Sequence, residues 1–506
     1  MKNYESWLCA TLAVLMLAGS AVAFVGCDDK DDGKDDKPKE TTADTGAQNE
    51  DHRFDDIDYD GREFRIYTSI HVAATGMGHS SNDLIEGVGK IDGSLVNDAV
   101  FERNTDVERL LGVKLTYEHA DLNYDNVPAA IDKLVMSNTD EYDLIINDLF
   151  PLTDLSIKGS FCNTLDSDAV FDFERSYWYK DYMSDLRLRD GYQYLLAGDY
   201  FIDIIRSAHL LLANKDVYTE LHQGNADTLY DTVINYQWTY DKMYSLVKNT
   251  YFDKNANQAV DKGDRYGFMA PDYWGSSIPF IIGGTPNFIS RDDDGTPSIA
   301  LGECKRVDAV TNKLTQLFHD NSSSILVLNE EEVLDAFAAN QVLFLGYQRL
   351  GSLENNVLKG MESDFAILPY PMLMESDKKY TTSTHDTTEV GAIMTTALDN
   401  MEFISTVVEV LNRETANTLM PKYYKEGLQV MYVDDSKAAS MIDIIHDNFG
   451  TTFPIAYNST LNNQFIKSIS DASADGREYK AEYPKVKKRL NTCLNNALST
   501  FDKTVG

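Results

Sequence analysis

The sequence has few cysteines and few basic residues. Among its 506 residues are 5 Cys, and 45 Lys+Arg stand against 81 Asp+Glu, for a net charge of −36. No CxxC pair occurs, so neither a zinc ribbon nor a thioredoxin-type redox site is expected. Without clustered cations, nucleic acid and other polyanions are poor partners. Neutral or cationic small molecules remain as ligands.

Catalytic and metal-binding signatures are also missing. The sequence has no Walker loop, HExxH or GxSxG, and its 9 His residues show no i, i+4 pair. Residues 76–81 (GMGHSS) lack the third glycine of a dinucleotide-binding loop. We therefore expect no catalytic residue, cofactor or metal. A glycoside hydrolase that uses two of the many carboxylates stays open as an alternative.

The N-terminus has the pattern of a bacterial lipoprotein signal. Residues 8–25 are uncharged, and their second half is rich in Ala, Gly and Ser, which favours a cleaved secretory signal over a membrane span. The junction Phe24-Val25-Gly26-Cys27 resembles a lipobox, in which the cysteine is lipidated and becomes the new N-terminus. Residues 1–26 are then the signal peptide, and Cys27 anchors the protein to the outer face of the cell membrane. An uncleaved signal anchor is the alternative.

An acidic segment follows the lipobox. Residues 28–60 contain 14 acids and 5 bases, with almost no apolar residue before Phe54. Such a segment buries too little apolar surface to offset the entropy of ordering. We predict a disordered tether over residues 27–60.

Beyond the tether, strand-length apolar runs alternate with helical patterns. Such alternation predicts an α/β fold with a mainly parallel sheet. Asn97 is expected to cap the helix that ends at Gly112, and Thr239 a second helix. Strands are predicted over residues 63–69, 114–118, 142–147, 209–214, 342–346 and 365–368, helices over 97–111, 127–136, 239–248 and 483–502, and a hairpin over 287–301.

Aromatic residues are abundant, with 29 Tyr, 22 Phe and 4 Trp. Sugar rings stack their apolar faces on such side chains, while Asp, Asn and Arg bind their hydroxyls. A neutral carbohydrate therefore suits this acidic chain.

Several segments together resemble a known family. They are AVFERNTDVERLLGVKL (99–115), YDLIIND (142–148), WTYDKMYSLVK (238–248), YGF (266–268), AFAANQVLFLGY (336–347) and DFAILPYP (364–371). In order and spacing they resemble bacterial extracellular solute-binding proteins (family 1-like), the lipoprotein receptors of ABC importers, in the group that mostly takes up oligosaccharides. The resemblance runs from about residue 61 to the C-terminus.

The resemblance implies a periplasmic-binding-protein-like fold of two α/β lobes, joined by hinge strands around a ligand cleft. Lobe one is expected over residues 61–150 and about 389–432, and lobe two over residues 151–386 and about 433–506. The implied role is non-catalytic: a monomer captures a small neutral solute, most simply an oligosaccharide, and delivers it to the permease. A surface glycoside hydrolase or a carbohydrate-binding adhesin or sensor remains the alternative.

Candidate ligand contacts are residues at predicted strand ends. Tyr347 leads them, because it follows the apolar strand 342–345 and Gly346, where an aromatic ring would be partly exposed to a sugar. The other candidates are Trp274, Tyr273, Asp199, Asp148 and Trp178. Cys162, Cys304 and Cys493 leave one disulfide possible.

Overall fold

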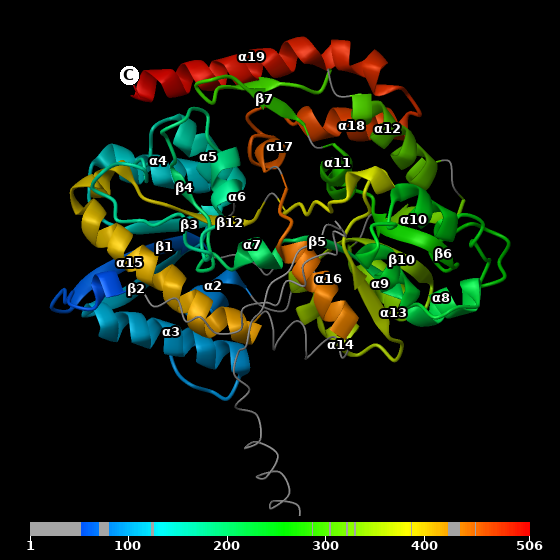
Figure 1. Ribbon diagram of the computed structural model, residues 1–506, viewed down its shortest axis with the longest axis horizontal. Helices are drawn as coiled ribbons and strands as arrows, with labels where there is room; N and C mark the ends of the chain where they lie inside the picture. Colours follow the sequence, from blue (N-terminus) through cyan, green and yellow to red (C-terminus); the bar gives the residue numbers. More distant parts are fainter. Residues whose placement is uncertain are drawn as a thin grey trace, which may run out of the picture. The chain divides into compact units, whose positions relative to one another are not determined.

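The computed structural model contains two five-stranded sheets (Figure 1). It describes residues 52–69, 80–122, 126–285, 287–302, 305–319, 322–327, 330–385, 387–423, 436–450 and 452–505. The strand order is β2-β1-β3-β12-β4 in the first sheet and β11-β5-β10-β6-β9 in the second. A separate hairpin, β7 (Ile289–Arg291) and β8 (Pro297–Ile299), confirms the hairpin predicted over residues 287–301.

The first sheet draws on distant parts of the chain. Its strands are β1 (Arg62–Ser69), β2 (Val113–Ala120), β3 (Leu144–Asp148), β4 (Leu195–Leu196) and β12 (Glu389–Ala392). The helices packed on it or on one another are α3 (Leu95–Leu111), α4 (Val127–Ser137), α5 (Leu149–Ile157) and α15 (Met401–Glu414). Figure 1 shows α3 and α15 side by side next to β1 and β2.

The second sheet comes from the middle of the chain. Its strands are β5 (His209–Asn214), β6 (Tyr266–Pro271), β9 (Ser324–Val327), β10 (Val342–Arg349) and β11 (Phe365–Leu368). Helices packed on it are α8 (Lys215–His222), α9 (Thr228–Ile234), α10 (Tyr240–Val247), α13 (Glu330–Ala338) and α16 (Ser436–His446). Every residue of β5 and β10 is buried, and the apolar runs over residues 210–213 and 342–345 predict this for part of each strand.

The remaining elements include short helices and a long C-terminal one. They are α2 (Ser81–Ile85), α6 (Lys180–Asp185), α7 (Asp203–Arg206), α11 (Ile278–Gly284), α12 (Lys305–Leu314), α14 (Asn356–Lys359), α17 (Phe453–Ala456), α18 (Phe465–Ala474) and α19 (Tyr479–Val505), with the 3₁₀ turns η1 (His52–Phe54), η2 (Trp274–Ser277), η4 (Leu350–Glu354), η5 (Glu375–Asp377) and η6 (Thr395–Asn400) and the π-helical turns η3 (Thr315–His319) and η7 (Thr415–Leu419). In the part of the chain that the structure describes, no helix combines the length and apolar character needed to cross a membrane.

Both sheets are mixed, so the expectation of mainly parallel pairing is wrong. Strands β1, β2 and β3 pair in parallel, as do β6, β9 and β10. However, β12 runs antiparallel to β3 and β4, and β5 runs antiparallel to β10 and β11. The reason is that β5 and β12 each enter from the other sheet and not through a βαβ crossover, which is the connection that enforces parallel pairing.

Most predicted helix ends are confirmed, but α19 extends over Tyr479–Val505 beyond the predicted 483–502, and α3 has a different N-cap. Gly112 ends this helix with a φ of 60°, where a Cβ would lie 1.9 Å from Oδ1 of Asp58. Only glycine fits there. The N-cap is Ser94 and not Asn97, whose Oδ1 instead accepts a 3.0 Å hydrogen bond from the Val88 N–H.

Two predicted boundaries differ from the structure. The expected start of lobe two at residue 151 would place β4 with the second sheet, yet β4 pairs with β12 of the first. The expected tether end at Asp60 is also too late, because residues 52–60 pack on the first sheet's helices. Phe54 is 5% exposed, and the Tyr59 N–H donates to Leu111 O at 2.8 Å. Residues 27–51 lie outside the described residues.

Candidate functional site

Two segments connect the sheets and lie side by side. Residues 206–209 lead from α7 to β5, and residues 382–385 lead from the second sheet towards β12; we call these the crossing segments. Ala208 and Thr384 form an antiparallel bridge, and the His209 N–H donates to Ser383 O at 2.9 Å. This arrangement corresponds to the hinge strands that the sequence predicted.

A buried ion pair stabilises the first crossing segment. The Arg206 guanidinium donates to both carboxylate oxygens of Glu354, each at 3.0 Å. Arg206 is 1% exposed and Glu354 4%. The Tyr423 hydroxyl adds a 2.5 Å bond to Glu354, and Asp203 lies 3.3 Å from Arg206. Paired and hydrogen-bonded in this way, the charges are tolerated inside the protein.

Tyr347 occupies a β-bulge on β10. The register shifts between Leu345 and Gln348, and Tyr347 has a φ of 59°, a rare conformation for a bulky side chain. Its ring is 4% exposed and stacks on His209 with centroids 5.2 Å apart. The expected partly exposed ring at a strand end is therefore wrong, since β10 continues to Arg349 and the rings of His209, Tyr273 and His385 surround that of Tyr347.

Gly346 likewise has a structural role that differs from the expected approach to a ligand. A Cβ at this position would lie 2.7 Å from the ring of Phe268 on the neighbouring strand. The glycine thus allows β10 and the Phe268 ring to pack closely.

Two histidines flank Tyr347. The Thr387 N–H donates to Nδ1 of His385 at 3.2 Å, and Nε2 of His385 lies 2.8 Å from the Tyr347 hydroxyl. His209 Nδ1 lies 3.1 Å from Ser383 O. Burial, with His385 and Arg349 nearby, lowers the pKa of His209 well below its usual value, so its imidazole is neutral.

A second group of polar and aromatic residues surrounds Asp199. The Tyr179 hydroxyl donates to Oδ1 of Asp199 at 2.9 Å. Burial raises the pKa of this carboxyl to about 7, although the Tyr179 bond and the charge of His446 oppose the rise. The centroid of the half-buried Tyr179 ring lies 5.9 Å from that of Phe449 and 6.3 Å from that of His446. His446 is the last residue of α16, which packs on the second sheet, and Phe449 follows this helix.

The Asp199 group therefore joins parts of the chain that belong to different sheets. Tyr179 and Asp199 flank β4 of the first sheet, whereas His446 ends a helix that packs on β11 of the second. Nearby, the Tyr182 hydroxyl lies 3.2 Å from that of Thr384 on the second crossing segment. We call Tyr179, Asp199, His446 and Phe449 the junction cluster.

The other predicted contacts lie in different environments. Trp178 is 4% exposed and donates from Nε1 to Glu409, and Asp148 is 1% exposed opposite Glu389 on β12. Tyr273 is 42% exposed, with its ring 5.9 Å from Tyr347. Trp274 begins η2, and Cys27 and Cys304 lie outside the described residues. Cys162 and Cys493 are free thiols.

Sequence reasoning named Asp199, and it named Tyr273 and Tyr347 separately as ligand contacts. It did not point to His209, His385, Tyr179, His446 or Phe449. One usable signal was the polar run TTSTHDTT (381–388) between two apolar strands. Thr382, Ser383, Thr384 and Thr388 of this run are buried, which is uncommon for such polar residues and requires hydrogen-bond partners. The pairing of Tyr179 with residues about 270 positions later had no local signal.

The junction cluster contains aromatic ring faces, one carboxyl group and one hydroxyl. Hydroxyls of a polyol can donate to Asp199 and bond to Tyr179, while its C–H faces pack on Tyr179 and Phe449. Among the described residues, no group of three or more His, Cys, Asp or Glu side chains is placed to hold a metal ion.

Neither a family model nor a curated protein matches the sequence. Solved structures do match. The maltose/maltodextrin-binding domain MalE from Bdellovibrio bacteriovorus, bound to maltotriose, has a TM-score of 0.52 at 12% identity, over 86% of this chain and 100% of that one. An ABC transporter solute-binding protein from Thermotoga lettingae, bound to α-D-tagatose, has a TM-score of 0.53 at 12% identity, over 86% and 100%.

A third match is UgpB from Mycobacterium tuberculosis in complex with glycerophosphocholine. It has a TM-score of 0.52 at 15% identity, over 86% of this chain and 98% of that one. At such identities the likeness concerns the fold. The chain has the two-lobed α/β fold of ABC-transporter solute-binding proteins, as its sequence predicted.

Proposed function

We propose that this protein is the extracytoplasmic solute-binding component of an ABC importer and that it captures a neutral oligosaccharide without catalysis. The observation that carries the proposal is the junction cluster, in which the Tyr179–Asp199 pair of the first sheet meets Phe449 and His446 beside the second. A solute bound there would contact both lobes, which is what couples binding to closure in a hinged receptor.

The chemistry of the cluster favours a neutral, hydroxylated ligand. Asp199 accepts hydrogen bonds, Tyr179 and Phe449 offer apolar faces, and the chain's net charge of −36 disfavours anions. Maltotriose and tagatose, which occupy two of the matched proteins, belong to this class. The hydrolase alternative has no comparable support, because the matched proteins are binding proteins.

We further propose that Cys27 is lipidated, that the protein acts as a monomer at the outer face of the cell membrane, and that it delivers its solute to permease subunits there. Support comes from the lipobox-like junction and the acidic segment that follows it. A receptor tethered in this way stays close to its transporter while its ligand-binding part moves freely.

A thermal-shift panel tests the solute class. Maltose, maltotriose, maltotetraose, tagatose and glycerophosphocholine would be added to the chain from Cys27 onwards. A ligand at 100 times its Kd adds about 2.7 kcal/mol to the free energy of unfolding, which is a clear rise in Tm. Asp199→Asn should abolish the rise, whereas Asp471→Asn, on the exposed side of α18, should keep it. If no saccharide raises Tm, the proposal is wrong; if glycerophosphocholine alone does, the solute class is wrong.

A further inference from the structure

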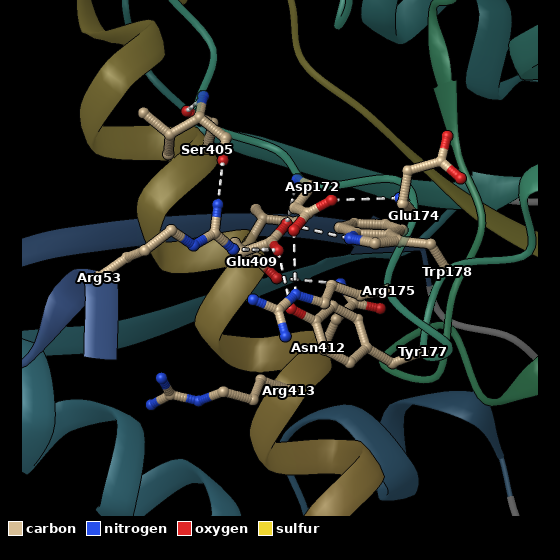
Figure 2. Close-up of polar contacts among 12 residues, drawn as sticks. Arg53, Asp172, Glu174, Arg175, Tyr177, Trp178, Ser405, Glu409, Asn412 and Arg413 are labelled. Atoms are coloured by element: carbon tan, nitrogen blue, oxygen red, sulfur yellow. Dashed lines mark hydrogen bonds and ion pairs between the residues drawn. The ribbon is translucent and has the colours of Figure 1, made fainter. Parts of the chain in front are cut away.

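Glu409 on α15 is a fully buried carboxylate that accepts four hydrogen bonds (Figure 2). Its Oε1 accepts from Nη2 of Arg53 at 2.8 Å and from the Tyr177 hydroxyl at 2.7 Å. Its Oε2 accepts from Nε1 of Trp178 at 2.9 Å and from the Asp172 N–H at 3.3 Å. A carboxylate with 0% exposure needs such partners to remain charged.

The same face of α15 holds neighbouring backbone. Ser405, Glu409 and Asn412 are spaced by four and three residues and so lie on one helix face. Ser405 Oγ accepts from the Val170 N–H at 3.0 Å, and Asn412 Oδ1 accepts from the Tyr200 N–H at 3.1 Å. Glu409 and Asn412 therefore hold Trp178 and Tyr200, on either side of the Tyr179–Asp199 pair, whereas Ser405 holds residue 170.

Asp199 is attached to the Glu409 partners through backbone contacts. The Asp199 N–H donates to Tyr177 O at 2.9 Å, and Trp178 forms an antiparallel bridge with Gly198. The Tyr179 N–H then donates to Ala197 O at 3.0 Å. Tyr177 and Trp178 bond to Glu409 through their side chains. Their main chains, with that of Tyr179, hold residues 197–199.

Gly198 shows how closely these parts are packed. A Cβ at this position would lie 2.4 Å from Oδ1 of Asn412 and 2.8 Å from the Trp178 ring. Even a methyl group would force the segment away from α15. The place of Asp199 next to Tyr179 therefore depends on contact with this helix.

We propose that Glu409 is a positioning residue of the solute site. It fixes Tyr177 and Trp178, which in turn hold Asp199 where the Tyr179 hydroxyl reaches its carboxylate. The inference rests on the proposed function of the junction cluster, and it assigns Trp178 to the support of the site instead of to contact with the sugar.

Glu409→Gln is the sharpest variant because it preserves shape. All four partners of Glu409 are donors, so a glutamine would aim its amide N–H₂ group at two of them. Either the Trp178 side or the Arg53 side loses its bonds. Trp178→Phe, which removes the Nε1–H donor, is a second variant in case the first folds poorly. Ser405→Ala is the matched control, since Ser405 lies on the same helix face but bonds to Val170.

The titration of Asp199 is a readout that needs no ligand. Carboxyl ¹³C NMR measures this titration, and the Asp199→Asn variant identifies the Asp199 signal. Burial, the Tyr179 hydroxyl and His446 together set its midpoint. We expect Glu409→Gln and Trp178→Phe to move the midpoint by about half a pH unit or more, because each displaces residues 197–199. Ser405→Ala should leave it in place. An unchanged midpoint in both variants would overturn the inference.

A double-mutant cycle on affinity completes the test. For the saccharide that raises Tm most, Glu409→Gln should weaken binding about tenfold or more in the wild-type background and hardly at all in Asp199→Asn. Equal losses in both backgrounds would contradict positioning through Asp199. If no saccharide binds but the midpoint moves, Glu409 positions Asp199 and the saccharide function is what fails.

Discussion

The Tyr347 hydroxyl, on the second sheet, and Nε2 of His385, on the crossing segment that leads to the first sheet, are 2.8 Å apart. The Tyr347 N–H also donates to the Tyr370 hydroxyl at 2.7 Å, and its ring stacks on His209. A tyrosine held at both ends in a strained backbone conformation fixes the second crossing segment against β10. We therefore expect a structural role for Tyr347 at the hinge.

Substitutions of Tyr347 should separate these contributions. Tyr347→Phe removes one hydrogen bond and should lower the free energy of unfolding by about 0.5–1.5 kcal/mol. Tyr347→Ala empties a buried site and should cost about 3–5 kcal/mol. Urea unfolding without ligand measures both, and Tyr273→Phe, at a ring that is 42% exposed, is the control. A large loss of sugar affinity at unchanged stability would instead restore the stacking role expected from the sequence.

The carboxyl of Asp199 should make stability depend on pH. Its pKa rises from 3.8 to about 7 on folding, so the folded state holds this proton more tightly than the unfolded state. The contribution is fully present below about pH 4 and is lost as pH rises to about 7. Relative to Asp199→Asn, the wild type should lose up to about 4 kcal/mol across that range.

Urea unfolding at pH 4 to 8 would measure this difference. His446 and Tyr179 face the carboxyl, so the series would be repeated in His446→Gln. If the wild type and Asp199→Asn change in parallel over the whole range, Asp199 is not the titrating group.

The Arg206–Glu354 pair should be the most sensitive ion pair of the crossing segments. Glu354→Gln removes the closer of two counter-charges from a buried guanidinium, leaving Asp203 at 3.3 Å, and should cost about 3 kcal/mol. The exposed Lys467–Asp471 pair on α18 is the control, and Asp471→Asn should cost less than about 1 kcal/mol. Similar losses in the two variants, measured by thermal unfolding, would refute a special role for the crossing segment.

Membrane attachment should depend on Cys27. Cys27→Ala should release the protein into the soluble fraction with its Tm unchanged. The substitution removes the residue that would carry all the acyl chains, and a stable anchor needs more than one such chain. Fractionation of cells that express the two forms measures this. A Cys27→Ala protein that stays firmly with the membrane would favour the uncleaved signal anchor over residues 8–25.

Local patterns predicted the elements well. His209–Asn214 matches its predicted strand because six consecutive residues of that segment are buried, and burial on both faces leaves a continuous apolar run in the sequence. Gly112 and Thr239 were found because capping depends on a few neighbouring residues. The fold class followed from the alternation of such elements.

The missed features depend on contacts between distant residues. The apolar residues Leu195–Leu196 predict a short strand, but its pairing with β12 about 200 residues later has no local signal. The sequence predicted that the strand ends before Tyr347 and leaves its ring accessible. In the structure β10 continues past Tyr347 through a bulge, which forms only by pairing with β5. Glu409 looked like one more acid on an amphipathic helix, since its four donors lie more than 200 residues earlier.

The position of β12 between β3 and β4 has a consequence for the order of folding. All strands of the second sheet, from His209 to Leu368, leave the ribosome before β12 does. β4 pairs with the first sheet through β12, so the first sheet stays incomplete until residue 392 has emerged. The inserted half can therefore finish its sheet first, although N-terminal units usually fold first. A chain that stops before Glu389 would leave β3 with an open edge and thus be prone to aggregate.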